Sequence, residues 1–411
     1  MTTNQLQKNI IQTPKLRFAG FNDAWSKNRL AKIATFAKGK GISKDDTVEG
    51  RKYKCIRYGE LYTRYKEIIE EVYSKTNITP ADSFLSQKDD VIIPASGETA
   101  LDIATTSCVK NAGILLGGDI NILRFNKEQN GSFFAYYLKN FKKRDIARLA
   151  QGQSVVHLYS SQLKEIRLNT PSLAEQEKIA SFLESVDKFI KNLQTQNETL
   201  QEYKRGIIQK IFNQEIKFKD EKEKSFPEWK EMKLGEFLKE RREYSTKGKG
   251  YTHISLTTQG VVPKSERYNR DFLVGDDEIK KYKITHLNDL CYNPANLKFG
   301  VITLNKLSAG IFSPIYVTFE IIDQDVDFIG YCLCRTAFIN KARRYEQGTV
   351  YERMAVSPAD FLKVKIKLPS VPEQKKISAY LQTIDNEIKL KEQQIEQAEE
   401  WKKGLMQGLF I

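Results

Sequence analysis

Cationic and hydrogen-bonding side chains gather in the polar segments of this 411-residue chain. Lys and Arg neutralise phosphate groups, whereas Arg, Gln, Asn, Ser and Thr can form hydrogen bonds with the edges of bases. The residues that could do this chemistry fall into two sets, one in each half of the chain. The first set is Lys38, Lys40, Arg57, Tyr58, Tyr62, Arg64, Gln151, Gln153 and Ser154. The second set is Arg241, Arg242, Lys247, Lys249, His253, Thr257, Thr258, Gln259, Arg343, Arg344, Gln347, Thr349 and Arg353.

The charge balance of the chain favours a polyanionic partner. With 66 Lys and Arg against 52 Asp and Glu, the formal net charge is +14, so the surface potential is expected to attract duplex DNA. Lysine-rich solvated helices give the same count, and for any single candidate residue a solvated surface position is an equally good interpretation. The sequence therefore indicates a nucleic-acid partner without assigning individual contacts.

The sequence lacks the signatures of common catalytic sites. It contains no G-x-x-x-x-G-K-[ST] loop for ATP and no strand-linked G-x-G-x-x-G for a nucleotide cofactor. Residues 292–296 are similar to the Asn-Pro turn of DNA amino-methyltransferases, but Ala295 and Asn296 replace its second proline and its stacking aromatic. The five cysteines show neither the spacing of a disulfide framework nor that of a zinc site. We therefore expect no catalytic residue and no metal ligand, and a reducing compartment.

The segments that must position the candidate residues occur twice. Residues 171–212 and 369–410 match in gapless register about 198 residues apart, with about 17 of 42 positions identical. Weaker matches, such as Trp25 with Trp229, extend the repeat beyond these segments. Two copies at this distance predict a duplicated unit of about 200 residues rather than a solenoid. Because the copies differ freely between the matching positions, we expect two recognition modules on one scaffold.

Each repeated segment predicts a long α-helix. Ser172 with Glu175, and Ser370 with Glu373, form the S-x-x-E pattern in which both side chains satisfy free N–H groups of the first turn. Apolar residues then alternate in steps of four and three, which makes a narrow stripe that a partner helix must cover. The predicted helix interface consists of Ile179, Leu183, Val186, Ile190, Leu193, Leu200, Ile207, Ile377, Leu381, Ile384, Ile388, Ile395 and Leu405.

The natural partner for each stripe is the other copy. Helices related by duplication can pack about an approximate two-fold axis, which makes the pair antiparallel, and about 41 residues span roughly 60 Å. A helical hairpin that only supports a core is the alternative to such a spacer. Asn197, Lys204, Lys391 and Lys402 interrupt the stripe. Such residues either fix the register of the helices or face solvent where the helices splay, and we favour solvent.

The remaining sequence predicts two similar α+β domains. Strands are expected at 91–93, at 114–116 and along 311–319, and helices at 132–142 and 328–345. The predicted order is a tail (1–14), a first recognition domain (15–168), a central helix (169–213), a linker (214–223), a second recognition domain (224–367) and a C-terminal helix (368–411).

With these features the chain resembles the DNA specificity subunits of type I restriction-modification systems. The resemblance covers essentially the whole length and rests most on the two helix starts, PSLAEQEKIASFL and PSVPEQKKISAYL. The segments 21–30, 226–234, 151–166 and 347–361 are also similar to family members.

The resemblance implies a mechanism. Such a subunit reads a two-part DNA target with one half-site per domain, while its helices set the gap and dock two methyltransferase subunits, which restriction subunits then join. S-adenosylmethionine, ATP and magnesium belong to these partners, so the resemblance implies a non-catalytic chain without its own cofactor. Because the two domains differ, the target is expected to be asymmetric.

The sequence also predicts where the protein is found, and it leaves alternative functional classes open. No run approaches the roughly 18 apolar residues of a membrane span, and we expect a cytoplasmic protein. Two other classes stay open, namely a structural adaptor whose modules bind peptides or RNA, and an enzyme with an unrecognised nuclease site. A two-part methylated motif in the genome would separate the specificity subunit from both.

Overall fold

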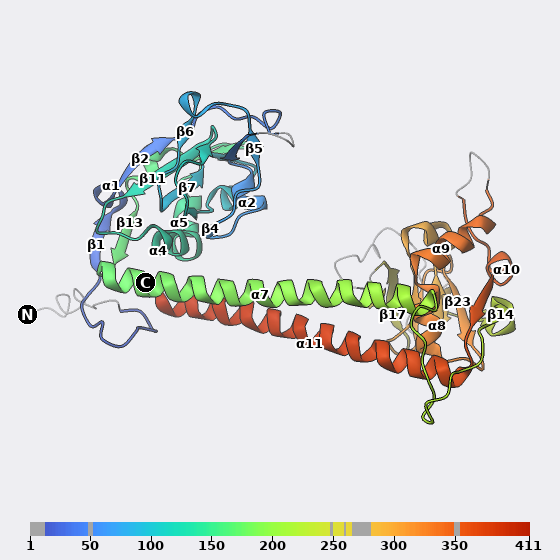
Figure 1. Ribbon diagram of the computed structural model, residues 1–411. Coiled ribbons are helices and arrows are strands. Elements are labelled where there is room, and N and C mark those ends of the chain that lie inside the picture. The colour runs from blue at the N-terminus through green and yellow to red at the C-terminus, as the bar shows by residue number, and fades with distance from the viewer. Residues whose placement is uncertain (1–12, 48–51, 247–249, 259, 265–280, 349–353) are drawn as a thin grey trace, which may run out of the picture. The chain divides into compact units, whose positions relative to one another are not determined.

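The structure is a computed structural model that describes residues 13–47, 52–246, 250–258, 260–264, 281–348 and 354–411. The chain divides into unit 1, of residues 1–195 and 391–411, and unit 2, of residues 196–390. Two long helices, α7 (Leu173–Phe212) and α11 (Val371–Leu409), each contribute to both units (Figure 1). The fold is α+β, with two mixed domains and two long helices, as the sequence predicts.

Unit 1 contains a five-stranded and a four-stranded sheet. Its central strand β7 (Asp90–Pro94) is buried along its whole length, because the apolar run of Val91, Ile92 and Ile93 suits a strand that is covered on both faces. The five-stranded order is β2 (Ala34–Lys38), β11 (Ile120–Phe125), β7, β9 (Ser107–Val109) and β4 (Ile68–Ile69). The four-stranded order is β5 (Lys75–Thr76), β3 (Tyr53–Ile56), β10 (Leu115–Leu116) and β6 (Phe84–Leu85).

Helix α4 (Gly131–Tyr136) supplies much of the aromatic core of unit 1. The side chain of Asn130 accepts a hydrogen bond from the backbone N–H of Phe133 and so caps the helix. The helix passes into a π-helical turn at Tyr137–Phe141, so the helix predicted over 132–142 has two parts. The other elements are β1 (Ser26–Arg29), paired with β13 (Arg167–Thr170), β8 (Ser96–Gly97), paired with β12 (Val156–His157), α1 (Leu30–Ile33), α2 (Glu60–Thr63), α3 (Ala100–Ile103), α5 (Lys143–Ala147) and α6 (Ser160–Leu163).

Unit 2 repeats this plan with different strand lengths. One sheet has the order β15 (Leu238–Glu240), β23 (Val317–Ile321), β20 (Leu290–Tyr292) and β21 (Ile302–Leu304). The other has the order β16 (Tyr244–Ser245), β19 (Tyr282–Thr285), β22 (Gly310–Phe312), β17 (Thr252–Thr257) and β18 (Gly260–Pro263). The remaining elements are β14 (Lys230–Lys233), paired with β24 (Lys365–Leu368), α8 (Val326–Leu333), α9 (Thr336–Ala342) and α10 (Pro358–Phe361).

Two segments of unit 2 are broken where the sequence predicted continuity. The run 311–319 belongs to two strands of different sheets, β22 and β23, because Pro314 between them cannot donate a ladder hydrogen bond. The helix predicted over 328–345 is α8, α9 and a 3-10 turn at Arg343–Tyr345. It is interrupted at Arg335, whose φ of −75° and ψ of 142° are extended.

The long helices pack in opposite directions within each unit. In unit 1, the core contains Ile179 and Leu183 from the start of α7 together with Leu409 from the end of α11. In unit 2, it contains Ile377 from the start of α11 and Ile211 from the end of α7. The start of one helix therefore lies beside the end of the other in both units, which is the predicted antiparallel pairing.

The first turns of the long helices differ from the expected capping boxes. The carboxylate of Glu175 accepts two hydrogen bonds of 2.8 Å from the Arg17 guanidinium, and Glu373 Oε1 accepts one of 3.4 Å from Trp229 Nε1. Among the described residues, Ser370 Oγ has no hydrogen-bond partner. The S-x-x-E pattern located the helix starts correctly, but the carboxylates contact other parts of the domains.

The glutamine after each of these glutamates joins the long helix to its domain. Gln176 Oε1 accepts the backbone N–H of Asn130 at 2.9 Å, and its Nε2 donates to the Pro171 carbonyl at 2.9 Å. In unit 2, Gln374 makes the same contacts with the N–H of Asp325, at 3.0 Å, and the Pro369 carbonyl, at 2.9 Å. Asn130 and Asp325 cap α4 and α8, so each glutamine fixes the start of a domain helix to the start of a long helix.

Candidate nucleic-acid interface

Four loops of unit 1 meet beside the ends of β2 and β7. Lys38 Nζ lies 3.4 Å from Asp119 Oδ1, and the Asp119 carbonyl accepts the N–H of Ala95 at 2.7 Å. The Ala95 carbonyl in turn accepts the N–H of Leu158 at 3.0 Å. We call residues 38–41, 95–102, 117–119 and 151–159 loop cluster 1, and it brings together Lys38, Lys40, Gln151, Gln153 and Ser154.

A short hairpin forms the most exposed part of loop cluster 1. Gln151 and His157 exchange two backbone hydrogen bonds, of 2.9 and 2.7 Å, which leaves Gln153 and Ser154 exposed at the tip. His157 Nδ1 lies 3.1 Å from Ser96 Oγ, and its ring stacks on that of the exposed Tyr159. The sequence-based set missed these three polar residues because Ser96 comes from a different loop.

The predicted residues of segment 57–64 separate. Backbone contacts place β3 beside the cluster, since the N–H of Gly117 donates to the carbonyl of Ile56 at 2.9 Å. Burial raises the pKa of Tyr62, as do Tyr58, Glu98 and the charge of Asp102, so its phenol stays a neutral hydrogen-bonding group beside α3.

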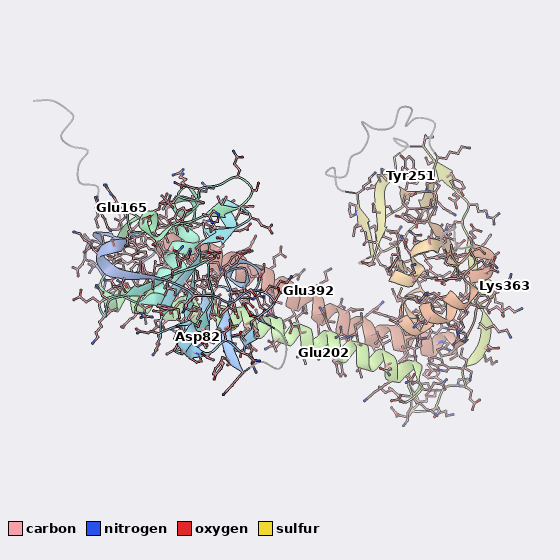
Figure 2. All side chains as sticks on the ribbon, turned by 90° about the horizontal axis from the view of Figure 1, so that it is seen from above. Asp82, Glu165, Glu202, Tyr251, Lys363 and Glu392 are labelled. Carbon is pink, nitrogen blue, oxygen red and sulfur yellow. The ribbon has the colours of Figure 1, made fainter. Side chains whose placement is uncertain are left out.

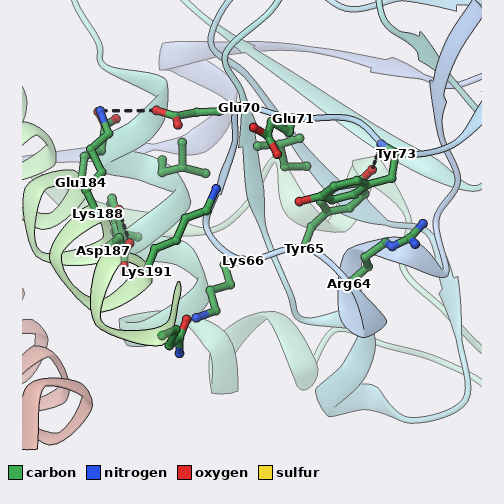
Figure 3. Close-up of a pocket in the computed structure, with 14 residues that line it drawn as sticks. Arg64, Tyr65, Lys66, Glu70, Glu71, Tyr73, Glu184, Asp187, Lys188 and Lys191 are labelled. Carbon is green, nitrogen blue, oxygen red and sulfur yellow. Dashed lines mark hydrogen bonds and ion pairs between the residues drawn. The ribbon is translucent and has the colours of Figure 1, made fainter. Parts of the chain in front are cut away.

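Arg64 lies away from loop cluster 1, in a hollow of about 280 Å³ between the domain and α7 (Figure 3). Its guanidinium lies 4.9 Å from the ring centre of Tyr73, which stacks on Tyr65. Glu70 and Lys188 form an ion pair of 3.5 Å across the hollow. Arg64 therefore contacts Tyr73 and, at 3.7 Å, the carboxylate of Glu60, and it does not join Lys38 and Gln151.

Unit 2 has a loop cluster in the equivalent place. Gln347 and Ala355 exchange backbone hydrogen bonds of 2.9 and 3.0 Å, and the N–H of Val356 donates to the Pro294 carbonyl at 3.3 Å. Ala295, Asn296, Lys298, Phe299 and Met354 line a shallow hollow of about 290 Å³ here. Residues 293–300, 347–348 and 354–356 are called loop cluster 2. Phe299 is 65% exposed, and a search for polar residues could not have found it.

The Asn-Pro turn in loop cluster 2 has a structural role. The Asn293 side chain caps the 3-10 turn Pro294–Phe299 by accepting the N–H of Ala295 at 3.1 Å. Tyr292 is fully buried and its hydroxyl donates to the Val356 carbonyl. The turn therefore shapes the loop.

The predicted arginines of unit 2 differ in how freely they can contact a ligand. Arg241 is held by three carboxylates, Asp289 at 2.8 Å, Glu320 at 3.2 Å and Glu243 at 3.5 Å. Arg242 is far more exposed and contacts Glu240. Arg343 pairs with Glu346 at 2.9 Å, and Arg344 is exposed.

The other predicted residues of unit 2 lie on and around β17. The His253 ring packs edge-on against Tyr282, with ring centres 4.9 Å apart. Thr257 Oγ1 donates to the Gly260 carbonyl at 2.9 Å, and Thr258 is exposed. The predicted residues outside the described part of the chain are Lys247, Lys249, Gln259, Thr349 and Arg353.

The predicted helix-interface residues take two kinds of position. Val186, Ile190 and Leu193 pack with Ala398, with Ile395 and Leu405 partly buried beside them. Several others instead join the domain cores or lie at their margin, and Leu200 is only partly buried. The members in or against the domain cores are Ile179, Leu183, Ile207, Ile377, Leu381, Ile384 and Ile388.

Two lysines that interrupt the stripe do not face solvent, contrary to our interpretation. In unit 1, Lys402 Nζ of α11 lies 2.6 Å from Asp187 Oδ1 of α7, and Tyr136 of α4 donates a 2.6 Å hydrogen bond to Asp187 Oδ2. In unit 2, Lys204 of α7 pairs with Asp385 of α11, to which Tyr331 of α8 donates. Both lysines lie over the tyrosine ring, 5.4 and 5.3 Å from its centre.

We call these two sets, Lys402–Asp187–Tyr136 and Lys204–Asp385–Tyr331, the junction triads. Each joins both long helices to one domain helix within its own unit. Exposed carboxylates of the helices behave differently, as Glu202 and Glu392 extend outward from them (Figure 2). The repeat in the sequence could have indicated these triads, because the Lys and the Asp of one triad recur in the other at the spacing of about 198 residues.

The described part of the chain has neither a candidate metal cluster nor a candidate membrane span. No group of three or more His, Cys, Asp or Glu residues is placed to hold a metal ion there. No helix in that part combines the length and the apolar character that a membrane crossing requires.

Comparison with known proteins identifies the family. The family model described as type I restriction modification DNA specificity domain matches residues 22–202 and again residues 227–400. The chain therefore belongs to this family, with one copy of the domain in each half.

Individual relatives agree with the family assignment. The type I restriction enzyme MjaVIII specificity subunit of Methanocaldococcus jannaschii is 25% identical over 415 residues, which cover 94% of this chain and 92% of the relative. The putative MjaX specificity subunit of the same organism is 27% identical over 324 residues, or 72% and 71% of the two chains. In fold, the chain is similar to the crystal structure of an S subunit from M. genitalium, with a TM-score of 0.61, 17% identity and coverage of 97% and 99%.

Proposed function

We propose that this chain is the DNA-reading subunit of a type I restriction-modification complex, in which each domain binds one half of an asymmetric, two-part DNA target. The long helices set the gap between the half-sites and dock two methyltransferase subunits, which restriction subunits join. S-adenosylmethionine, ATP and magnesium are held by those partners, and this chain directs adenine methylation and cleavage without catalysing either. We place its action in the cytoplasm.

The observation that supports this proposal most is the pair of equivalent loop clusters with unlike side chains. Both clusters place a Gln-Gly hairpin against the loop that leaves a central buried strand. One presents Lys40, Gln153 and Ser154 together with the exposed Leu101 and Val155, whereas the other presents Lys298, Phe299 and Met354. Similar hairpins that carry different side chains are what two readers of different half-sites require, because base edges are distinguished by the hydrogen-bonding groups that meet them.

A methylation map tests the proposal. Adenine methylation is mapped genome-wide in cells that carry the chain with its methyltransferase and in cells that lack the chain. We expect one two-part motif that depends on the chain. Exchange of residues 15–168 for the domain of another family member should change one half of the motif, and exchange of residues 224–367 should change the other. A motif without two parts, or one in which either exchange alters both halves, contradicts the proposal.

The gap offers a second test. Inserting four residues between Leu193 and Leu200 lengthens α7 by about 6 Å, which is expected to change the preferred gap by one or two base pairs. Binding should also weaken steeply with salt, with log K falling by about 0.9 per phosphate neutralised for each tenfold rise in salt. A variant that assembles normally and keeps the original gap contradicts the spacer role of the helices.

A further inference from the structure

The two junction triads have a geometry that stability alone does not explain. The Lys402–Asp187 pair, with side chains 11% and 24% exposed, requires desolvation that the attraction between the charges often only offsets, so an apolar seam of the same volume is commonly at least as stable. The Lys204–Asp385 pair is 25% and 38% exposed, and a pair so close to solvent contributes little stability by itself. The helix pair already has such a seam at Val186, Ile190 and Leu193. Polar residues inside a helix seam instead favour one alignment over the others, because any other alignment leaves a partly buried charge unpaired.

Each triad extends this alignment to a domain. The Tyr hydroxyl is a directional donor on a domain helix, and its acceptor is the same carboxylate that the lysine of the opposite helix neutralises. Movement of the domain around the helix pair would break the Tyr–Asp hydrogen bond, and sliding of the helices would break the Asp–Lys pair. Movement of the domain and sliding of the helices would therefore each break a contact of the same aspartate.

Each domain also has a second contact with its long helix. The glutamine at the helix start is fully buried and holds the cap of the domain helix, through Gln176 in unit 1 and Gln374 in unit 2. In both units the triad aspartate lies eleven positions further on, about 16 Å along the helix. A single contact would leave the domain free to pivot, whereas two contacts separated along the axis fix its direction.

We propose that Tyr136 and Tyr331, through Asp187 and Asp385, are positioning residues that fix the angular setting of each recognition domain on the helix pair and thereby the narrow range of DNA gaps that the chain accepts. The second half of this inference rests on the proposed function. The first half concerns each unit alone, since all groups of a triad belong to one unit. The glutamine contact sets where the domain begins on the helix, and the triad sets the direction in which it points.

The test uses the full chain with Tyr331→Phe, which removes one oxygen atom and keeps the partly buried ring. Spin labels on Lys341→Cys and Glu202→Cys, both exposed positions of unit 2, report the distance between domain and helix in a Cys334→Ser background, because the other four cysteines are buried. We expect the distance distribution to broaden or shift. Tyr203→Phe is the matched control, because its hydroxyl contacts Tyr380 of the opposite helix at 3.0 Å, and we expect no change.

The DNA measurement uses duplexes that carry both half-sites of the mapped motif at a series of gaps. In the wild type, a gap one base pair away from the best gap should give a higher Kd. For Tyr331→Phe the ratio of these two Kd values should fall about threefold to tenfold, which is the usual contribution of one hydrogen bond. Binding to a single half-site should stay unchanged. Tyr136→Phe should act in the same direction.

A charge exchange separates positioning from a loss of folding. Lys204→Asp alone faces Asp385 with a second carboxylate and should broaden the distances strongly. Lys204→Asp combined with Asp385→Lys restores an ion pair and should recover most of the wild-type distribution.

An unchanged distance distribution in Tyr331→Phe, or equal weakening of single half-site binding, overturns the positioning role. If the wild-type chain showed no gap preference at all, the proposed function would fail, whereas the spin-label distances would still decide whether the triad sets the direction of the domain.

Discussion

The two junction triads have the same residue types on their helices, a Lys and an Asp, but they differ in the further contacts that each domain makes with the Lys. In unit 1, Lys402 pairs with Asp187 and also lies 3.3 Å from Glu67, and its side chain is 11% exposed. In unit 2, Lys204 has Asp385 as its only carboxylate among the described residues, and its side chain is 25% exposed. A cavity of about 770 Å³ opens beside Lys204. The duplicated helices therefore kept one geometry while the domains packed against them to different depths.

The starts of the long helices show the same asymmetry. Glu175 is bound by the two guanidinium nitrogens of Arg17, whereas Glu373 has only Trp229, and its buried Oε2 has no partner among the described residues. Arg17 and Lys217 lie in matching segments, since the neighbouring Phe18 and Phe218 pack on the equivalent residues Phe182 and Tyr380. Unit 1 therefore compensates its buried charges more completely than unit 2 does.

The largest effect is expected from removing the lysine of the unit 1 triad. Lys402→Met leaves Asp187 and the buried Glu67 without their common cation, and should lower the opening free energy of unit 1 by about 3–5 kcal/mol. Lys204→Met should cost about 1 kcal/mol in unit 2, because Asp385 is reached by solvent. Hydrogen exchange reports the two units separately. Lys389→Met, at an exposed position of α11, is the control, and equal losses in the two units would remove the distinction.

A smaller effect is expected at the helix start of unit 1. Arg17→Met removes two charged hydrogen bonds from a buried carboxylate and should cost unit 1 about 1.5–3 kcal/mol. Lys217, in the matching segment of unit 2, is exposed. Lys217→Met should therefore change the stability of unit 2 by less than about 0.5 kcal/mol. Hydrogen exchange of residues 173–195 and 371–390 measures both. A comparable loss for Lys217→Met would show that the two helix starts are equivalent after all.

The stabilities of the two units are expected to respond differently to acid. Burial opposes ionisation of Glu67, but Lys139 and Lys402 outweigh it and lower its pKa to about 2. Its stabilising contribution is present above its unfolded pKa of about 4.5 and is lost as pH falls toward 2. Burial raises the pKa of Glu373, so its contribution is present below about pH 4.5 and is lost as pH rises through the folded value.

Substituting each of the two glutamates with Gln, which mimics the protonated acid, tests this difference in pH dependence. At pH 7, Glu67→Gln should be less stable than wild type and Glu373→Gln more stable, as measured by denaturant unfolding between pH 3 and 7. Both differences should shrink toward low pH. Effects of the same sign at pH 7 would contradict the assignment.

The smallest effect is expected where the two units differ only in an exposed aromatic pair. Unit 2 places the hydroxyls of Tyr203 and Tyr380 3.0 Å apart, whereas unit 1 has Trp401 packed edge-on against Phe182. Changing both tyrosines to Phe removes donor and acceptor together, which should alter the unfolding free energy by less than about 0.5 kcal/mol. Thermal unfolding of the double variant and of each single variant checks it, and a clear loss in the double variant would assign the hydroxyl pair a larger role.

The sequence predicted the elements whose signals are local. The stripe spacing and the S-x-x-E pattern located α7 and α11 to within a few residues, and the run at 91–93 located β7, because periodicity and helix starts depend on neighbours in the chain. The break between β22 and β23 was missed, although Pro314 was a local sign of it.

The contacts of the candidate site could not be predicted in the same way. Lys402 was assigned to solvent because its partners Glu67 and Tyr136 come from distant segments of the chain. Arg241 stays a predicted DNA contact, and its ion pairs with Asp289 and Glu320 could not be predicted because neither carboxylate is near it in sequence. Which residues of the two loop clusters meet a base stays a prediction, since base choice depends on loop geometry and DNA shape as well as on side-chain type.

Unit 1 is discontinuous in sequence, and this bears on how the chain folds during synthesis. Leu409 and Phe410 belong to its buried core, and the Ile411 carbonyl accepts a hydrogen bond of 2.7 Å from the Tyr137 hydroxyl. Unit 2, in contrast, is formed by one continuous stretch, 196–390. Residues 1–195 must therefore wait for residues 391–411 before the core of unit 1 can close, while unit 2 can close its core earlier. If a ribosome stalled near residue 400, residues 1–195 would lack the end of α11 that completes the core of unit 1.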